Sequence, residues 1–190
     1  MAIDLELVKL AEKYCNHYHK GQFRKGSNQP FSSHPIAVAR ILREFGYRDI
    51  ITQCVALLHD IVEDTSIITG EIKEAFGYEI SNGVYLLSKN TIDKETKKLA
   101  NRVISIDDCH LSQEDLYKIR LIYARDKIKR VKIADMIHNT RDLASLNSKG
   151  IERKIIDSKN FYTPMGRKVA PIMVNELIKN IENYKTKKNS

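Results

Sequence analysis

The segment from Arg48 to Asp64 is the most apolar part of the chain and limits the folds open to it. Its apolar residues recur at helical spacing: Ile51, Cys54, Val55, Leu58, Ile61 and Val62. The near-continuous apolar stretch from Ile50 to Leu58 is far too short to cross a bilayer. Other elements must surround so apolar a helix, so we expect it to lie at the centre of a helical core.

The remainder of the chain shows the same periodicity and few residues that favour turns. Glycine and proline number 8 and 4 of 190 residues, roughly half the usual share. No alternating strand pattern and no internal repeat is present. We predict an all-α fold of about eight to ten helices in a single domain, residues 1–190. The expected helices cover 7–18, 33–46, 48–64, 69–77, 80–87, 115–143 with a break near 124–126, 151–161 and 165–184, with a turn at 148–150.

The net charge indicates which classes of partner are favoured, and the cysteines indicate the cellular compartment. Lys and Arg number 32 against 24 Asp and Glu, a net charge of +8, which favours anionic partners such as nucleotides, nucleic acids or acidic lipids. Three cysteines without a C-x-x-C pattern argue against a disulfide framework. The N-terminal residues lack the basic start and apolar core of a signal peptide. We therefore expect a cytoplasmic protein that does not span a membrane.

Four polar residues, His59, Asp60, Glu63 and Asp64, stand together at the end of the apolar segment. Burial of such groups at the end of a core helix costs free energy unless they have hydrogen-bond, ionic or metal partners. A His-Asp pair alone is weak support for a site, because about 0.4 such pairs are expected by chance at this composition. Glu63 could orient or deprotonate a water molecule, with Asp64 as its partner or as a helix-end carboxylate.

Two residues outside this segment favour a metal centre. His34 precedes a helix start in SSHP, where a single histidine is usually a cap or a surface residue. Asp135 lies in the apolar helical pattern VKIADMIHNTRDL, where it could instead pair with Lys132 or Arg130. Two imidazoles and two carboxylates suit manganese, iron or zinc, with coordination positions open to water. The candidate ligands are His34, His59, Asp60 and Asp135.

A run of basic residues lies directly before Asp135 in the sequence. Residues 118–132 contain seven Lys or Arg and one acidic residue, Asp126. The run could line the approach of an anionic substrate, form a solvated face, or contact nucleic acid. Nucleic acid is the least favoured of the three, because no aromatic residues are interleaved in a recognisable motif.

These motifs resemble those of the HD metal-dependent phosphohydrolases. The segments HKGQFRKGSNQPFSSHPIAVARIL, VALLHDIVEDT, EAFG and VKIADMIHNTRDL are similar in order and wording to the hydrolase domain of the RelA/SpoT homologues, the enzymes of the alarmone nucleotides ppGpp and pppGpp. The resemblance covers about residues 19–143, with closing helices expected over 151–184. In length the chain resembles the small alarmone hydrolases, which have the hydrolase domain alone.

The resemblance implies an HD-type helical bundle, a Mn²⁺ cofactor and hydrolysis of the 3′-pyrophosphate of (p)ppGpp to GDP or GTP and pyrophosphate. Tyr162 could line the nucleoside pocket or be an ordinary core or surface tyrosine. The site residues that the resemblance implies are His34, His59, Asp60 and Asp135 as metal ligands, Glu63 and Asp64 for activation of water, Arg24 and Lys25 for phosphates, and Asn139 and Tyr162 near the nucleoside.

The chain also departs from the family pattern. After Arg24 and Lys25 it reads GSNQPF, where the long family enzymes read close to SGEPY, and residues 88–128 do not align. Three lysines in that region could bind phosphate or could belong to a solvated helix face: Lys94, Lys97 and Lys98. Two alternatives stay open: an HD hydrolase of another phosphorylated nucleotide such as NADPH, and a non-catalytic binder of alarmones or nucleic acid. The intact ligand set and acidic pair argue against the binder. Oligomeric state does not follow from the sequence.

Overall fold

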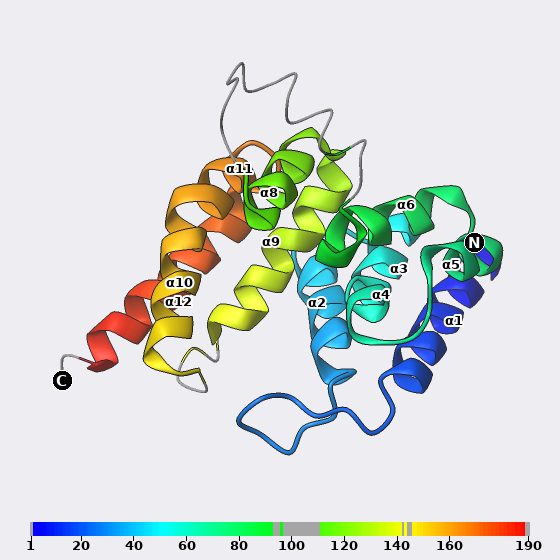
Figure 1. Cartoon of the computed structure of the whole chain (residues 1–190), viewed down its shortest axis with the longest axis horizontal. Helices are drawn as coiled ribbons and strands as arrows, with labels where there is room; N and C mark the ends of the chain where they lie inside the picture. The colour runs from blue at the N-terminus through cyan, green and yellow to red at the C-terminus, as the bar shows by residue number, and fades with distance from the viewer. Residues whose placement is uncertain (1, 93–95, 97–110, 142, 144–145, 189–190) are drawn as a thin grey trace.

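The structure, a computed structural model, describes residues 2–92, 96, 111–141, 143 and 146–188. These residues form helices without a strand, apart from one isolated bridge between Phe23 and Pro30, so the predicted all-α fold is confirmed (Figure 1). Among them, every helix is too short or too polar to serve as a membrane span. The elements are α1 (Ala2–Tyr18), α2 (Ser33–Glu44), α3 (Ile50–Leu58), α4 (Ile61–Asp64), α5 (Thr69–Phe76), α6 (Tyr78–Leu87), η1 (Lys89–Thr91), α8 (Gln113–Tyr123), α9 (Asp126–Arg141), α10 (Ser148–Asp157), η3 (Ser158–Tyr162), α11 (Thr163–Arg167) and α12 (Pro171–Lys188).

Helix α3 lies at the centre of the core, as its apolar sequence predicts. It packs against α1, α2, α6 and α9, and every residue from Thr52 to Leu58 is buried. The expected single helix over 48–64 is wrong, because the chain turns at His59 and Asp60 and resumes as α4. Nδ1 of His59 lies 2.8 Å from the carbonyl oxygen of Ala56. In an unbroken helix that carbonyl would accept from the Asp60 N–H, so the ring replaces a backbone hydrogen bond.

Helix α9 runs between two groups of helices, with α1–α6 on one side and α10–α12 on the other (Figure 1). The predicted break before it is confirmed, since α8 ends at Tyr123 and α9 begins at Asp126. Close packing of α6 on α3 and α9 depends on Gly83: a Cβ there would lie 2.6 Å from Val55 and 2.8 Å from Ile128. The core elements that present the polar motifs are therefore held tightly together.

Two boundaries in the C-terminal part differ from the sequence prediction. The expected turn at 148–150 is wrong: Asn147 caps α10 by accepting from the Gly150 N–H at 2.8 Å, so these residues form its first helical turn. The expected helix over 165–184 is divided, with α11 ending at Arg167 and α12 beginning at Pro171. Proline lacks an N–H and is favoured at the first position of a helix.

Candidate metal centre

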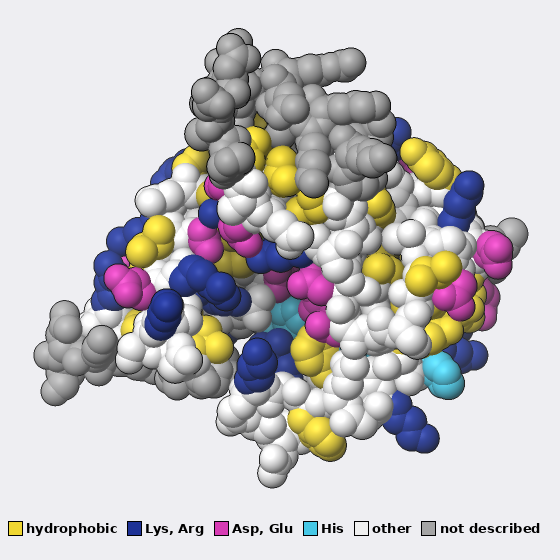
Figure 2. Space-filling view, viewed as in Figure 1, with side chains coloured by type: hydrophobic (Ala, Val, Ile, Leu, Met, Phe, Trp, Pro, Cys, Tyr) yellow, Lys and Arg dark blue, Asp and Glu magenta, His cyan; other side chains and the backbone are white. Residues whose placement is uncertain are grey.

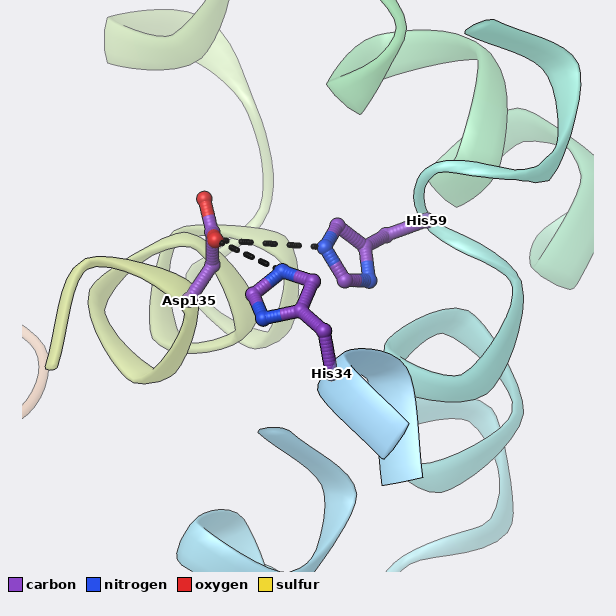
Figure 3. Close-up of side chains that lie close together, drawn as sticks. All are labelled: His34, His59 and Asp135. Carbon is purple, nitrogen blue, oxygen red and sulfur yellow. Dashed lines mark ion pairs between the residues drawn. The ribbon is translucent and has the colours of Figure 1, made fainter. Parts of the chain in front are cut away.

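Four predicted ligands meet where α2, α9 and the turn between α3 and α4 converge. Figure 3 shows three of them, His34, His59 and Asp135, pointing toward one another. Nε2 of His34 lies 3.2 Å from Oδ1 of Asp135 and 3.5 Å from Oδ2 of Asp60. Nε2 of His59 lies 3.2 Å from Oδ2 of Asp60 and 4.0 Å from Oδ1 of Asp135. The ligand atoms of His34, His59 and Asp135 all lie within 4.8 Å of one another. The fold thus brings together side chains that are far apart in sequence.

The chemistry of this cluster fits a divalent metal ion. His34, His59 and Asp135 are at most 4% exposed. Nε2 of His59 is buried and has no well-aligned hydrogen-bond partner among the described residues. Its Nδ1 bonds the Ala56 carbonyl, which can only accept, so Nδ1 holds the hydrogen and Nε2 faces the carboxylates. A cation bound there would satisfy the unpartnered nitrogen and both carboxylates at once.

Without a metal, the cluster holds a proton instead. Burial opposes the charged form of His59, but Asp60 and Asp135 raise its pKa to about 9. Burial likewise opposes ionisation of Asp60, yet His59 keeps the pKa of Asp60 low, at about 2. At neutral pH the metal-free site therefore contains a cationic imidazole beside anionic carboxylates. Metal binding has to displace that proton.

Asp135 is held from two sides on α9. Nζ of Lys132 lies 2.8 Å from Oδ2 of Asp135, and the side-chain amide of Asn139 donates to Oδ1. The sequence analysis gave an ion pair with Lys132 as an alternative to a metal role for Asp135. The structure contains this ion pair next to the other candidate ligands. Lys132 also lies 5.5 and 5.7 Å from the ring centroids of Tyr117 and Tyr162. These contacts fix the Asp135 carboxylate, leaving Oδ1 toward the imidazoles.

His138 is a neighbour of the site that the sequence analysis missed. Its Nδ1 lies 2.8 Å from Nδ1 of His34. Helical spacing could have drawn attention to it, since it follows Asp135 by three positions and shares its face of α9. Its contact with His34 on α2 depends on the tertiary fold and has no local signal.

The acidic pair lies on α4, next to the cluster. Oε2 of Glu63 accepts from the Lys89 backbone N–H at 2.9 Å. Burial raises the pKa of Asp64 to about 6, with help from the negative charges of Asp60 and Glu63. Asp64 is thus a carboxylate that titrates close to neutral pH, the range suited to a general base.

A hydrogen-bonded chain ties the loop before α2 to α4. Nδ1 of His19, a buried residue, lies 2.7 Å from Oε1 of Gln22, and Nε2 of Gln22 donates to the Asp64 carbonyl at 2.7 Å. This tie places the loop that contains the predicted phosphate-binding pair, Arg24 and Lys25, beside the acidic residues.

The two loop cations lie within electrostatic reach of the site. Burial lowers the pKa of His138 to about 4, and the charges of His34 and Arg24 contribute. Burial, Lys132 and Arg24 likewise lower the pKa of Lys154 on α10. The positive charge of Lys25 lowers the pKa of Asp64, whereas the negative charges of Asp60 and Glu63 raise it. Positive charge from the loop and from α10 therefore converges on the metal centre.

A small cavity of about 100 Å³ adjoins the cluster, lined by Lys132, Lys154 and Tyr162 among others. Tyr162 is buried. The ion pair between Lys89 and Glu114, 2.7 Å, forms part of the wall. Figure 2 shows acidic and histidine side chains in a hollow flanked by lysine and arginine. The cavity is smaller than the roughly 300–1,000 Å³ of most pockets that bind small molecules. Lys94, Lys97 and Lys98 lie outside the described residues.

The basic run over residues 118–132 does not form one charged stripe. Its members lie on α8, α9 and the link between them, and each has a carboxylate or carbonyl partner. These pairs are Lys118–Asp157, Arg120–Ser88, Arg125–Glu79, Lys127–Asp49, Lys129–Asp126, Arg130–Val169 and Lys132–Asp135. Lys132 is the member that contacts the metal cluster directly.

The chain is similar to known proteins over most of its length. The family model described as "HD domain" matches residues 10–170. A GTP pyrophosphokinase of Myxococcus xanthus is 31% identical over 167 residues, which are 87% of this chain and 21% of that protein. A GTP pyrophosphokinase rsh of Brucella melitensis is 32% identical over 161 residues, 84% of this chain and 20% of that protein. The chain thus spans about a fifth of the length of these two relatives.

A third relative is similar over most of its own length. The guanosine-3′,5′-bis(diphosphate) 3′-pyrophosphohydrolase MESH1 of Xenopus tropicalis is 34% identical over 153 residues, which are 79% of this chain and 76% of that protein. The solved structure of a metazoan ortholog of SpoT, described as hydrolysing ppGpp, has a TM-score of 0.74 at 20% identity. It covers 94% of this chain and 95% of its own, and it shows the same fold.

Proposed function

Because the chain belongs to the HD domain family, we propose that it hydrolyses the 3′-pyrophosphate of ppGpp and pppGpp, giving GDP or GTP and pyrophosphate. The buried cluster of His34, His59 and Asp135 carries this proposal, since it fits a divalent metal. The similarity to the MESH1 pyrophosphohydrolase, which extends over most of both chains, supports the substrate class.

Manganese is the proposed metal, held by His34, His59, Asp60 and Asp135. Two imidazole nitrogens and two carboxylates suit a borderline divalent ion better than calcium, which prefers oxygen alone. When bound, such an ion polarises a phosphoryl oxygen and lowers the pKa of water. The chain's own contribution is a largely buried, anchored ligand set, in which Lys132 and the Ala56 carbonyl fix the orientation of Asp135 and His59.

Glu63 and Asp64 are the proposed residues for moving the proton of the attacking water. Both lie on α4 directly after the ligands of the α3–α4 turn. Asp64, with its pKa raised to about 6, is largely ionised at neutral pH yet basic enough to accept a proton. The Glu63 carboxylate accepts a hydrogen bond from the Lys89 backbone N–H, which restricts its orientation.

Arg24, Lys25, Asn139 and Tyr162 are the proposed substrate contacts. The charges of Arg24 and Lys25 reach groups on two sides of the metal centre, as binding of a polyphosphate requires. Asn139 adjoins Asp135. Tyr162 lines the cavity, where it contacts a nucleoside once the wall residues move. The functional unit is proposed to be a single domain over residues 1–190, with the motif core at 19–143 and closing helices over 151–184.

A soluble nucleotide is the proposed partner, and the cytoplasm the proposed compartment. Cys15 and Cys54 are buried free thiols, which suits a reducing environment. The dispersed pairing of the basic run supports a nucleotide over nucleic acid.

The decisive experiment incubates purified protein with Mn²⁺ and a panel of ppGpp, pppGpp and NADPH, and resolves the products by anion-exchange chromatography. We expect GDP or GTP with stoichiometric pyrophosphate, and no product from the His59→Gln variant or after exhaustive chelation. Turnover of NADPH without turnover of ppGpp would reassign the substrate. Tight binding of ppGpp without turnover would make the chain a binder.

A further inference from the structure

His138 contacts the metal centre, but no step of the proposed reaction uses it. It lies on α9, one turn after Asp135, and is half-buried. Its Nδ1 is 2.8 Å from Nδ1 of His34, and the two ring centroids are 4.8 Å apart. Two nitrogens at that distance share one hydrogen, so one ring donates and the other accepts.

The direction of this bond decides whether His34 can bind a cation. A neutral imidazole has one hydrogen and binds metal only through its other nitrogen. On the Nε2 side of His34, Oδ1 of Asp135 lies 3.2 Å away and attracts that hydrogen. On the Nδ1 side, His138 competes for it. Without an acceptor at Nδ1, the carboxylate would favour the tautomer that cannot bind metal.

We propose that His138 is a positioning residue, which accepts a hydrogen bond from Nδ1 of His34 and so keeps Nε2 free for the metal ion. The inference rests on the metal centre proposed above but not on the identity of the substrate. His59 has a corresponding arrangement, in which the Ala56 carbonyl accepts from Nδ1. A carbonyl can only accept, whereas a histidine can do either. The position of the hydrogen on His34 therefore depends on the His138 side chain, which a substitution can remove.

The test compares His138→Asn with His138→Leu. Oδ1 of asparagine can occupy the place of Nδ1 and accept a hydrogen bond, whereas leucine has a similar shape and cannot. Mn²⁺ affinity is measured by competition with a chelator, without substrate. We expect leucine to weaken binding by about 10–100-fold, the usual effect of losing such a partner, and asparagine to stay within a few-fold of the wild type. His17→Leu, at an exposed histidine on α1, controls for loss of a histidine elsewhere.

Wild-type affinity in His138→Leu, or equal losses in the leucine and asparagine variants, would overturn the proposal. Nitrogen-15 NMR of the wild-type protein loaded with diamagnetic Zn²⁺ tests it without any variant, in case leucine prevents folding. The expected spectrum shows His138 with its hydrogen on Nε2 and an unprotonated Nδ1. A hydrogen on Nδ1 of His138 would refute the proposed direction. Neither readout depends on turnover, so failure of the proposed enzymatic function leaves the result interpretable.

Discussion

The metal-free protein should lose stability as pH rises from about 6.5 to 9. Its folded state holds the His59 proton up to a pKa of about 9, whereas the unfolded chain releases it near 6.5. Within this window the folded state binds more protons, so the free energy of unfolding falls by about 1.4 kcal/mol per pH unit. The total is roughly 3 kcal/mol across the window. The attraction that lowers the pKa of Asp60 is the same interaction and is counted once.

Urea unfolding of chelator-treated protein at several pH values measures this fall, with His59→Gln as the control. The variant keeps Cys15 and Cys54, whose pKa values burial raises to about 12, so the difference isolates the imidazole. Mn²⁺ affinity should show the opposite trend and rise about tenfold per pH unit, because binding releases the proton. Equal pH dependence in the variant and the wild type would refute the electrostatic account of the cluster.

Three further variants test the roles of individual side chains. Glu63→Gln should leave Mn²⁺ affinity unchanged and lower kcat by roughly 10²–10⁴-fold in steady-state assays; near-normal kcat would move the proton transfer to the neighbouring carboxylate. Changing both Arg24 and Lys25 to alanine should raise KM for ppGpp strongly at constant metal content, and an unchanged KM would assign them to the solvated surface. Lys132→Met should lower the free energy of unfolding by about 3 kcal/mol, because it removes the ion-pair partner at Oδ2 of the buried Asp135 carboxylate; denaturant titration at neutral pH measures the loss, and an unchanged midpoint would contradict it.

Sequence reasoning located the site through patterns within single helices. The apolar run before His59, the helix start at His34 and the acidic residue Asp135 in an apolar helical face each have a local signal, and the family resemblance agrees with the set that they form. Contacts between helices have no such signal. The bond from His34 to His138 joins positions on α2 and α9, and only the packed fold places them together.

Local energetics explain the misplaced boundaries in the same way. The helix break at Asp60 follows from a side chain competing for a backbone carbonyl. The early start of α10 follows from the capping of its first turn by Asn147. Hydrophobic periodicity continues through Asp60 and is weak at Asn147, so it does not predict either helix boundary.

The meeting of distant segments at one buried centre also sets an order of events during synthesis. At about 5–20 residues per second, a ribosome adds Asp135 several seconds after Asp60. Throughout that interval α2 and α3 lack α9, against which both pack in the finished fold, and the two imidazoles lack their buried carboxylate. An emerging chain therefore exposes an apolar face next to an incomplete ligand set, and a divalent metal ion at this site can stabilise the fold only after α9 has packed. Truncation before α9 should yield an aggregation-prone fragment that manganese does not rescue.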